Sequence, residues 1–172
     1  MQDLLDIEAY RLYLRGRYFF AKRTPQALLN AIECFDRAIA RDPAMALAYA
    51  GLADCHVRLG SFALAPEDSA YERAKAASLR ALELNSRVAE AHVTLGFVTA
   101  NAYDWVKGEE EFRRAIELNP YNAGAHTLYS AIPLCQRRFD EGELELALAH
   151  RFDPAWRSPA RRRVLPDLPP PV

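Results

Sequence analysis

The sequence has few glycines and cysteines and no surplus of charge of either sign. Its 172 residues include 7 glycines and 3 cysteines, and 22 lysines and arginines stand against 23 aspartates and glutamates. Cys34, Cys55 and Cys135 are widely spaced without a CxxC pair, which argues against a disulfide framework or a zinc site. We therefore expect small buried thiols in a reducing compartment. The balanced charge provides no general drive toward nucleic acid, so no direct nucleic-acid partner is expected.

Long apolar runs and a targeting segment are also missing. No apolar stretch approaches the ~18 residues of a membrane span, and the opening Met1–Asp6 does not have the pattern of a signal peptide. We expect a cytoplasmic protein without a membrane partner.

Patterns that carry chemistry are not found either. The sequence contains no Gly-x-Ser-x-Gly elbow, no Gly-x-Gly-x-x-Gly and no P-loop. Its histidines lack metal-ligand spacing, and His92 and His126 lie one 34-residue period apart, which favours packing between helices. The acidic run Glu109–Glu111 is expected in the first turn of a helix, where it complements the helix dipole. The sequence predicts no enzyme, no metal site and no cofactor.

What is present is an internal repeat. Three segments end alike, at Ala38–Pro43, Ala115–Pro120 and Ala149–Pro154, and Ala81–Ser86 matches them except for its last residue. The successive intervals between these ends are 43, 34 and 34 residues. The first interval is one 34-residue period with nine extra residues, which fit a connector around residues 61–68. A repeat of this length predicts a stack of similar units.

Each period contains two helical patterns. In the first, a large residue is followed three positions later by another and then by a tiny one, as in His92, Leu95 and Gly96, so both large residues share one helix face. The tiny residue lets a neighbouring helix approach closely. In the second, small residues flank an aromatic, as in Gly108, Phe112 and Ala115, while the corresponding slots hold Ser78 and Leu146 in the second and fourth units.

These motifs resemble the tetratricopeptide repeat over about residues 9 to 156. The resemblance implies an all-α fold, an α/α solenoid of antiparallel helix pairs with about four units. The domain is expected over 1–156, with repeats at about 9–45, 46–88, 89–122 and 123–156, followed by a disordered Pro/Arg-rich tail at 157–172. Expected helices span about 6–22, 25–41, 44–60, 67–85, 87–102, 105–118, 121–137 and 140–152.

Helix ends and one internal proline give more local predictions. Thr24 is expected to cap a helix that begins at Pro25, and Asp104 and Asp140 are expected caps as well. Pro133 lies inside the last first-half helix and predicts a kink.

More narrowly, the segments Ala9–Tyr18, Tyr103–Trp105 and Glu111–Pro120 resemble arrays that follow winged-helix or other signalling domains in bacterial regulators. The resemblance implies a regulatory role, although this sequence contains no such domain.

Stacked repeats of this kind have a concave surface lined by the first helix of each pair. We expect a non-catalytic protein-interaction module that binds a peptide or a helix of a partner protein there. Some arrays of this family grip the terminal carboxylates of a peptide with Lys and Asn in the first repeats and Lys or Arg in the third. The corresponding slots here hold Tyr13, Arg17, Gly51, Glu90 and Thr94, so this clamp is absent and a receptor for chaperone tails is not expected. The two N-terminal tyrosines can equally be packing residues. The expected groove residues are Tyr10, Tyr13, Arg17, Asp54, Arg58, Phe97 and Asn101.

The end of the stack is the second candidate surface. Terminal repeats need a polar outer face or a capping helix, and no amphipathic helix follows Leu144, Leu148 and Trp156. Either Trp156 and nearby tail residues fold back over this end, or the end pairs with another copy to form a homodimer. The alternative function is therefore a self-associating regulatory or assembly domain. The basic cluster Arg161–Arg163 is interpreted as part of a solvated tail.

Overall fold

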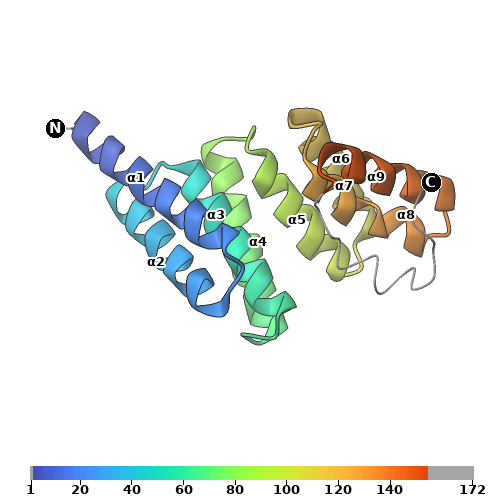
Figure 1. The fold of residues 1–172 in the computed structure, drawn as a ribbon, viewed down its shortest axis with the longest axis horizontal. Helices are drawn as coiled ribbons and strands as arrows, with labels where there is room; N and C mark the ends of the chain where they lie inside the picture. Colours follow the sequence, from blue (N-terminus) through green and yellow to red (C-terminus); the bar gives the residue numbers. More distant parts are fainter. Residues whose placement is uncertain (1, 155–172) are drawn as a thin grey trace.

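The computed structural model describes residues 2–154, with side chains from Ile7 onward, and every regular element in this range is a helix. Pairs of helices follow one another along an elongated array, with α1 and α2 at one end and α7, α8 and α9 at the other (Figure 1). The expected all-α class is confirmed. The helices are α1 (Gln2–Ala21), α2 (Pro25–Arg41), α3 (Ala46–Ser61), α4 (Glu67–Leu84), α5 (Ala89–Asn101), α6 (Trp105–Leu118), α7 (Ala123–Tyr129), α8 (Ala131–Cys135) and α9 (Phe139–Phe152).

Side-chain caps begin two helices where the sequence predicts them. The Thr24 hydroxyl accepts a hydrogen bond from the Ala27 amide at 3.2 Å ahead of α2, and the Asp104 carboxylate accepts one from the Lys107 amide at 3.3 Å ahead of α6. The predicted cap at Asp140 is wrong. Helix α9 begins at Phe139, so Asp140 lies in its first turn, where its charge still complements the helix dipole.

The turn from the first to the second helix of each pair contains a residue with positive φ. A non-glycine residue with positive φ follows α1, α3, α5 and α8. After the last three of these helices, the next amide donates to a carbonyl five residues earlier, the bond of a Schellman motif. This shared turn directs the second helix back along the first. The residues with positive φ are Arg23 (55°), Ala63 (54°), Tyr103 (63°) and Arg137 (63°).

In the core, aromatic rings pack against glycines and other small residues. Phe35 and Phe112 are each 1% exposed, at equivalent positions of α2 and α6. A Cβ atom on Gly96 would lie 3.1 Å from both the Phe112 ring and the Gly108 carbonyl oxygen, so α5 and α6 approach as closely as a glycine allows. Ser78 occupies the same slot in α4 and is fully buried.

The predicted kink at Pro133 is a complete break. Helix α7 ends at Tyr129 and α8 begins at Ala131, with Ser130 between them. Proline has no amide hydrogen for the Tyr129 carbonyl, so the ladder of hydrogen bonds is interrupted four residues before it. The expectation that all three cysteines are buried is also wrong. Cys34 and Cys55 are buried, but Cys135 is exposed because it is the last residue of the short α8.

Two histidines join helices, as their one-period spacing predicts. His92 Nδ1 lies 2.6 Å from a Glu111 carboxylate oxygen and its Nε2 lies 3.0 Å from the Ser86 carbonyl oxygen. His126 makes the same two contacts one repeat later, with Glu145 at 2.5 Å and the Pro120 carbonyl at 2.9 Å. The expected place of the acidic run in the first turn of a helix is wrong, because α6 begins at Trp105 and Glu109–Glu111 follow its first turn. Glu111 instead bridges α6 to α5.

Among the described residues, none of the helices combines the length with the apolar character that a membrane span needs.

Candidate functional site

The first helices of the pairs bring a polar cluster together on one face, which we call the A-helix face. It is formed by Tyr13 and Arg17 of α1, Asp54 and Arg58 of α3, and Glu90 of α5. Burial raises the pKa values of Tyr13 and Asp54, and across the helices the charge of Arg17 lowers both values while that of Glu90 raises both. Thus four predicted groove residues, Tyr13, Arg17, Asp54 and Arg58, gather in space.

Asp54 is the most perturbed acid of this cluster. Its side chain is partly buried, and burial raises its pKa to about 6. The Thr94 hydroxyl donates a 2.6 Å hydrogen bond to Asp54 Oδ1, which, together with the charges of Arg17 and Arg58, lowers the pKa and limits the rise. A carboxyl group of this kind changes its charge near neutral pH, which is uncommon outside functional sites and buried ion networks.

Three other charged residues of the A-helix face are partly buried without an ion pair. Among the described side chains, no carboxylate lies within 4 Å of Arg17 or Arg58, and no cationic group lies within 4 Å of Glu90. Arg58 instead lies over the Phe20 ring, 3.8 Å from its centroid. Burial lowers the pKa of Arg58, and Arg23 lowers it further. Partial burial of an unpaired charge costs free energy, which a binding partner of opposite charge can recover.

The two N-terminal tyrosines differ in their surroundings. Tyr13 is partly buried, and its ring centroid lies 6.0 Å from that of Phe35 and 5.9 Å from that of Tyr10. Tyr10 is 50% exposed. Tyr13 therefore contributes to the core as well as to the A-helix face, whereas half of Tyr10 is available to a partner.

Phe97 and Asn101 lie further along α5, and Phe97 packs against the core near Phe112 and Leu95. The Phe97 ring packs edge-on against Tyr71 of α4 with centroids 5.6 Å apart, and the exposed Asn101 amide donates to the Phe97 carbonyl oxygen at 2.8 Å. Within the described region, neither Phe97 nor Asn101 makes a ring contact or a hydrogen bond with Arg17 or Arg58. Sequence reasoning grouped them with the arginines because they share helix positions, and it missed the bond from Thr94 to Asp54.

At the other end of the array, α9 displays the leucines predicted for self-association. Leu144 is 59% exposed and Leu148 is partly buried. Trp156, the third predicted residue of this surface, lies outside the described residues.

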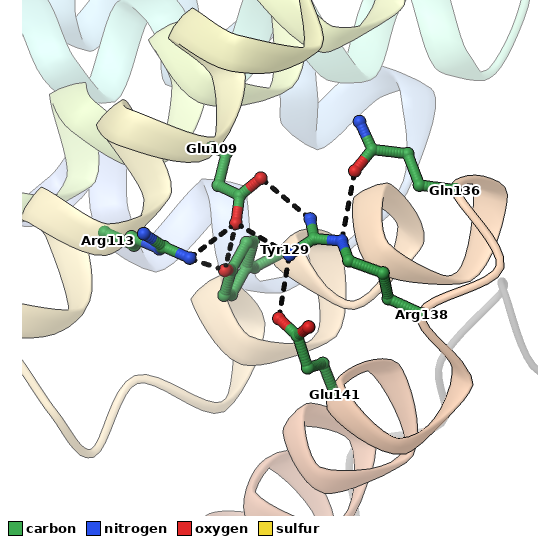
Figure 2. Close-up of polar contacts among 6 residues, drawn as sticks. All are labelled: Glu109, Arg113, Tyr129, Gln136, Arg138 and Glu141. Carbon is green, nitrogen blue, oxygen red and sulfur yellow. Dashed lines mark hydrogen bonds and ion pairs between the residues drawn. The ribbon is translucent and has the colours of Figure 1, made fainter.

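A polar network fastens α9 to the preceding pair (Figure 2). Glu109 of α6 accepts hydrogen bonds from the Tyr129 hydroxyl at 2.9 Å and from two Arg138 nitrogens at 2.8 and 3.2 Å. Burial opposes the ionisation of Glu109, but the bonds from Arg138 and Tyr129 outweigh it and lower its pKa. Arg113 donates to both Glu109 and Tyr129, and Arg138 also pairs with Glu141. Sequence analysis missed this network.

Beside this network lies an open groove between α6 and α9, with a volume of about 410 Å³. Its lining residues are Arg113, Ile116, Glu117, Tyr129, Glu141, Leu144 and Glu145. The described side chains form no group of three histidines, cysteines or carboxylates able to hold a metal ion.

The comparisons with known proteins point to one fold. No protein-family model matches the chain. The transcriptional regulator HilA of Salmonella typhimurium is 25% identical over 148 residues, covering 86% of this chain and 26% of the regulator. The chain thus spans about a quarter of the length of this curated relative.

Solved structures are similar along most of the chain. A thermophilic TPR protein from Thermus thermophilus, TTC0263, has a TM-score of 0.62 at 22% identity, covering 90% of this chain and 93% of that one. The first TPR domain of RPAP3, bound to the HSP90 peptide SRMEEVD, has a TM-score of 0.61 at 19% identity, covering 77% of this chain and 95% of that one. The chain therefore has the tetratricopeptide-repeat fold, as its closing motifs predict.

Proposed function

We propose that this chain is a non-catalytic protein-interaction module that binds a peptide or helix of a partner protein along the A-helix face. The observation that carries the proposal is the cluster of partly buried, unpaired charges at Arg17, Arg58 and Glu90 beside the half-exposed Tyr10. Aromatic and arginine side chains are enriched at the energetic centres of interfaces. The RPAP3 neighbour, bound to a peptide in its structure, supports peptide binding by this fold.

The charges favour a partner segment that carries both signs. A carboxylate of the partner would pair with Arg17 and Arg58, while a lysine or arginine would pair with Glu90 and with ionised Asp54. A peptide with only acidic side chains would meet repulsion from the two carboxylates. The preferred ligand is thus an amphipathic helix or extended segment with an apolar anchor next to Tyr10.

The test is a partner-recovery experiment with a charge-matched control. The full chain is used as bait in a lysate of its source cell, beside the double variant Arg17→Glu/Arg58→Glu. The control is Arg37→Glu/Arg73→Glu, which makes the same charge change at exposed arginines of α2 and α4. We expect a partner that binds wild type and control equally and binds the groove variant at least tenfold more weakly, a loss of about 1.4 kcal/mol or more.

Folding of each variant is checked by circular dichroism. Equal affinity of a folded groove variant and the wild type for every recovered partner would contradict the proposal.

A second candidate function is a self-associating regulatory or assembly domain of a bacterial transcription or signalling system. The similarity to the regulator HilA and the exposed Leu144 favour it. Light scattering across a hundredfold concentration range separates the two proposals, because self-association raises the mass with concentration.

A further inference from the structure

The connector between α3 and α4 helps to build a small pocket, which we call the connector pocket. This connector contains the residues by which the second unit exceeds the 34-residue period, and two of them, Phe62 and Leu64, form one wall. The other apolar walls are Phe20 near the end of α1 and Pro25 and Leu28 at the start of α2. The extra residues thus add a binding-sized feature that a regular repeat would not contain.

The wall that the connector provides is exposed but fixed in its backbone. The Phe62 and Leu64 side chains are 55% and 44% exposed. The amides of Leu64 and Ala65 both donate to the Leu59 carbonyl oxygen, at 2.9 and 3.2 Å, so the connector is fastened to the end of α3. A ligand therefore covers apolar surface here without first having to order the backbone.

The charged part of the lining is positive. Arg23 and Arg58 line the connector pocket, and no acidic side chain of the described region does. Burial lowers the pKa of Arg58 most, and the charge of Arg23 lowers it more than the charge of Asp54 raises it. The Arg58 guanidinium makes neither a hydrogen bond nor an ion pair with any described residue, and it lies over the Phe20 ring, 3.8 Å from its centroid. The N–H donors at the edge of the guanidinium thus remain for an anion.

The size of the pocket restricts the apolar part of a ligand. Its enclosed space is about 10 Å³, close to what one water-sized group needs, and a methyl group is of similar size. A carboxylate suits the cation, because it can share two parallel hydrogen bonds with a guanidinium. The ligand that matches both features is an acidic residue beside a short aliphatic one.

We propose that the connector pocket binds a short peptide segment in which a glutamate or aspartate adjoins an alanine- or valine-sized side chain. The carboxylate pairs with Arg58, and a methyl group of the neighbouring residue enters between Leu28 and Leu64. This inference rests on the proposed function, because Arg58 belongs to both sites, and it names the residues of a partner that anchor at this end of the A-helix face.

The test is a titration of the ¹⁵N-labelled full chain with hexapeptides that are blocked at both ends and differ only in their central pair. The pairs are Glu-Val, Gln-Val and Glu-Ser. We expect the Glu-Val peptide to shift the amide resonances of Ala63 and Leu64 and the Nε resonance of Arg58, with a Kd of about 1 mM. The other two peptides are expected to bind at least about fivefold more weakly, because each lacks one of the two contacts.

Two pairs of variants locate the site. Arg58→Gln and Leu64→Ser should each weaken Glu-Val binding at least about fivefold. Their controls should keep the wild-type Kd: Arg17→Gln changes another partly buried arginine without an ion pair, which does not line the pocket, and Leu79→Ser changes a leucine with the same 44% exposure. Circular dichroism checks that each variant is folded.

The contrary results separate the connector pocket from the proposed function. The absence of a saturable shift of these resonances, or equal binding of the Glu-Val and Gln-Val peptides, would overturn the pocket proposal. Equal losses in Arg17→Gln and Arg58→Gln would also overturn it but leave the proposed function standing, because the peptide would then lie along the A-helix face. Binding of the Glu-Val peptide as expected, together with partners that the Arg17→Glu/Arg58→Glu bait recovers as well as the wild type, would overturn the proposed function alone.

Discussion

At the scale of single residues, the partly buried charges of the A-helix face lower the folding stability of the free protein. Asp54 illustrates this, since burial makes its ionised form costly and the Thr94 hydroxyl compensates only in part. Arg17, Arg58 and Glu90 add partly buried charges that no described side chain pairs. A core built only for stability would hold apolar residues here. Residues that lower stability in the free protein are expected where binding is the function.

We expect Asp54→Asn to stabilise the protein by about 1–3 kcal/mol at pH 7, because each unit of pKa shift corresponds to about 1.4 kcal/mol. The pKa of Asp54 is about 6 in the folded protein, against about 3.9 in an unfolded chain. The folded state therefore holds this proton more tightly, and stability falls as pH rises from about 4 to about 6. Asparagine has no proton to lose and can still accept the Thr94 bond.

Urea unfolding between pH 4 and pH 8 measures this difference. The stability gap between the variant and the wild type should open from about pH 4 to about pH 6 and then stay constant up to pH 8. Glu72→Gln, at an exposed carboxylate of α4, is the control and should show no such gap. A gap that is already complete at pH 4 would contradict the account.

At the scale of helices, the equivalent bridges of His92 and His126 connect successive elements in the C-terminal half. Both ring nitrogens of His92 face acceptors, a carboxylate of α6 and a backbone carbonyl, so the protonated ring satisfies both. Burial alone would lower the pKa of His92, but the bonds to Glu111 and Ser86 outweigh it, whereas the charge of Arg114 opposes them, and the net result is a raised pKa.

We expect Glu111→Gln to destabilise the protein by about 1–2 kcal/mol at pH 6 and by less at pH 8. The raised pKa of His92 means that the folded state keeps this proton to higher pH than the unfolded chain. The stabilisation is complete below about pH 6.5 and is lost as pH rises through the folded pKa. Thermal unfolding at several pH values checks this. Glu110→Gln, at the exposed neighbouring residue, should leave the pH dependence as in the wild type.

The local sequence predicted the positions of the helices far better than it predicted the contacts of the candidate site. The Thr24–Pro25 start and the closing motifs placed α2 and α6 at the expected residues, because caps and prolines act within a few positions of the chain. The break at Ser130 was anticipated only as a kink. The Asp54–Thr94 bond joins residues 40 positions apart, and the Glu109–Arg138 pair joins residues 29 apart. Such pairs depend on how repeats stack, which a periodic pattern does not specify.

At the scale of the whole molecule, stability is distributed unevenly along the array. The main contacts between helix pairs join neighbours, such as α2 with α3 and α4 with α5, so the stack is held largely by local interfaces and not by one central core. Helix α3 buries seven residues along its length. In contrast, only Gly142 and Ala149 are buried in α9, and only Ile132 and Pro133 in α8. The attachment of the C-terminal helices α8 and α9 thus depends on the Glu109–Arg138 network and the His126–Glu145 bridge more than on apolar burial.

We therefore expect α8 and α9 to open before the rest of the array unfolds. Hydrogen exchange read by mass spectrometry should show a smaller opening free energy for α8 and α9 than for α3 to α5. Ile132→Ala removes a side chain that is 1% exposed and should lower the opening free energy of α7 to α9 by about 2–4 kcal/mol. Phe35→Ala is the matched cavity at the other end, and it should destabilise α1 to α3 while α8 and α9 keep their exchange rates. Equal effects of both variants on every helix would mean that the array unfolds as a single cooperative unit, and then the neighbour-only picture of its stability would be wrong.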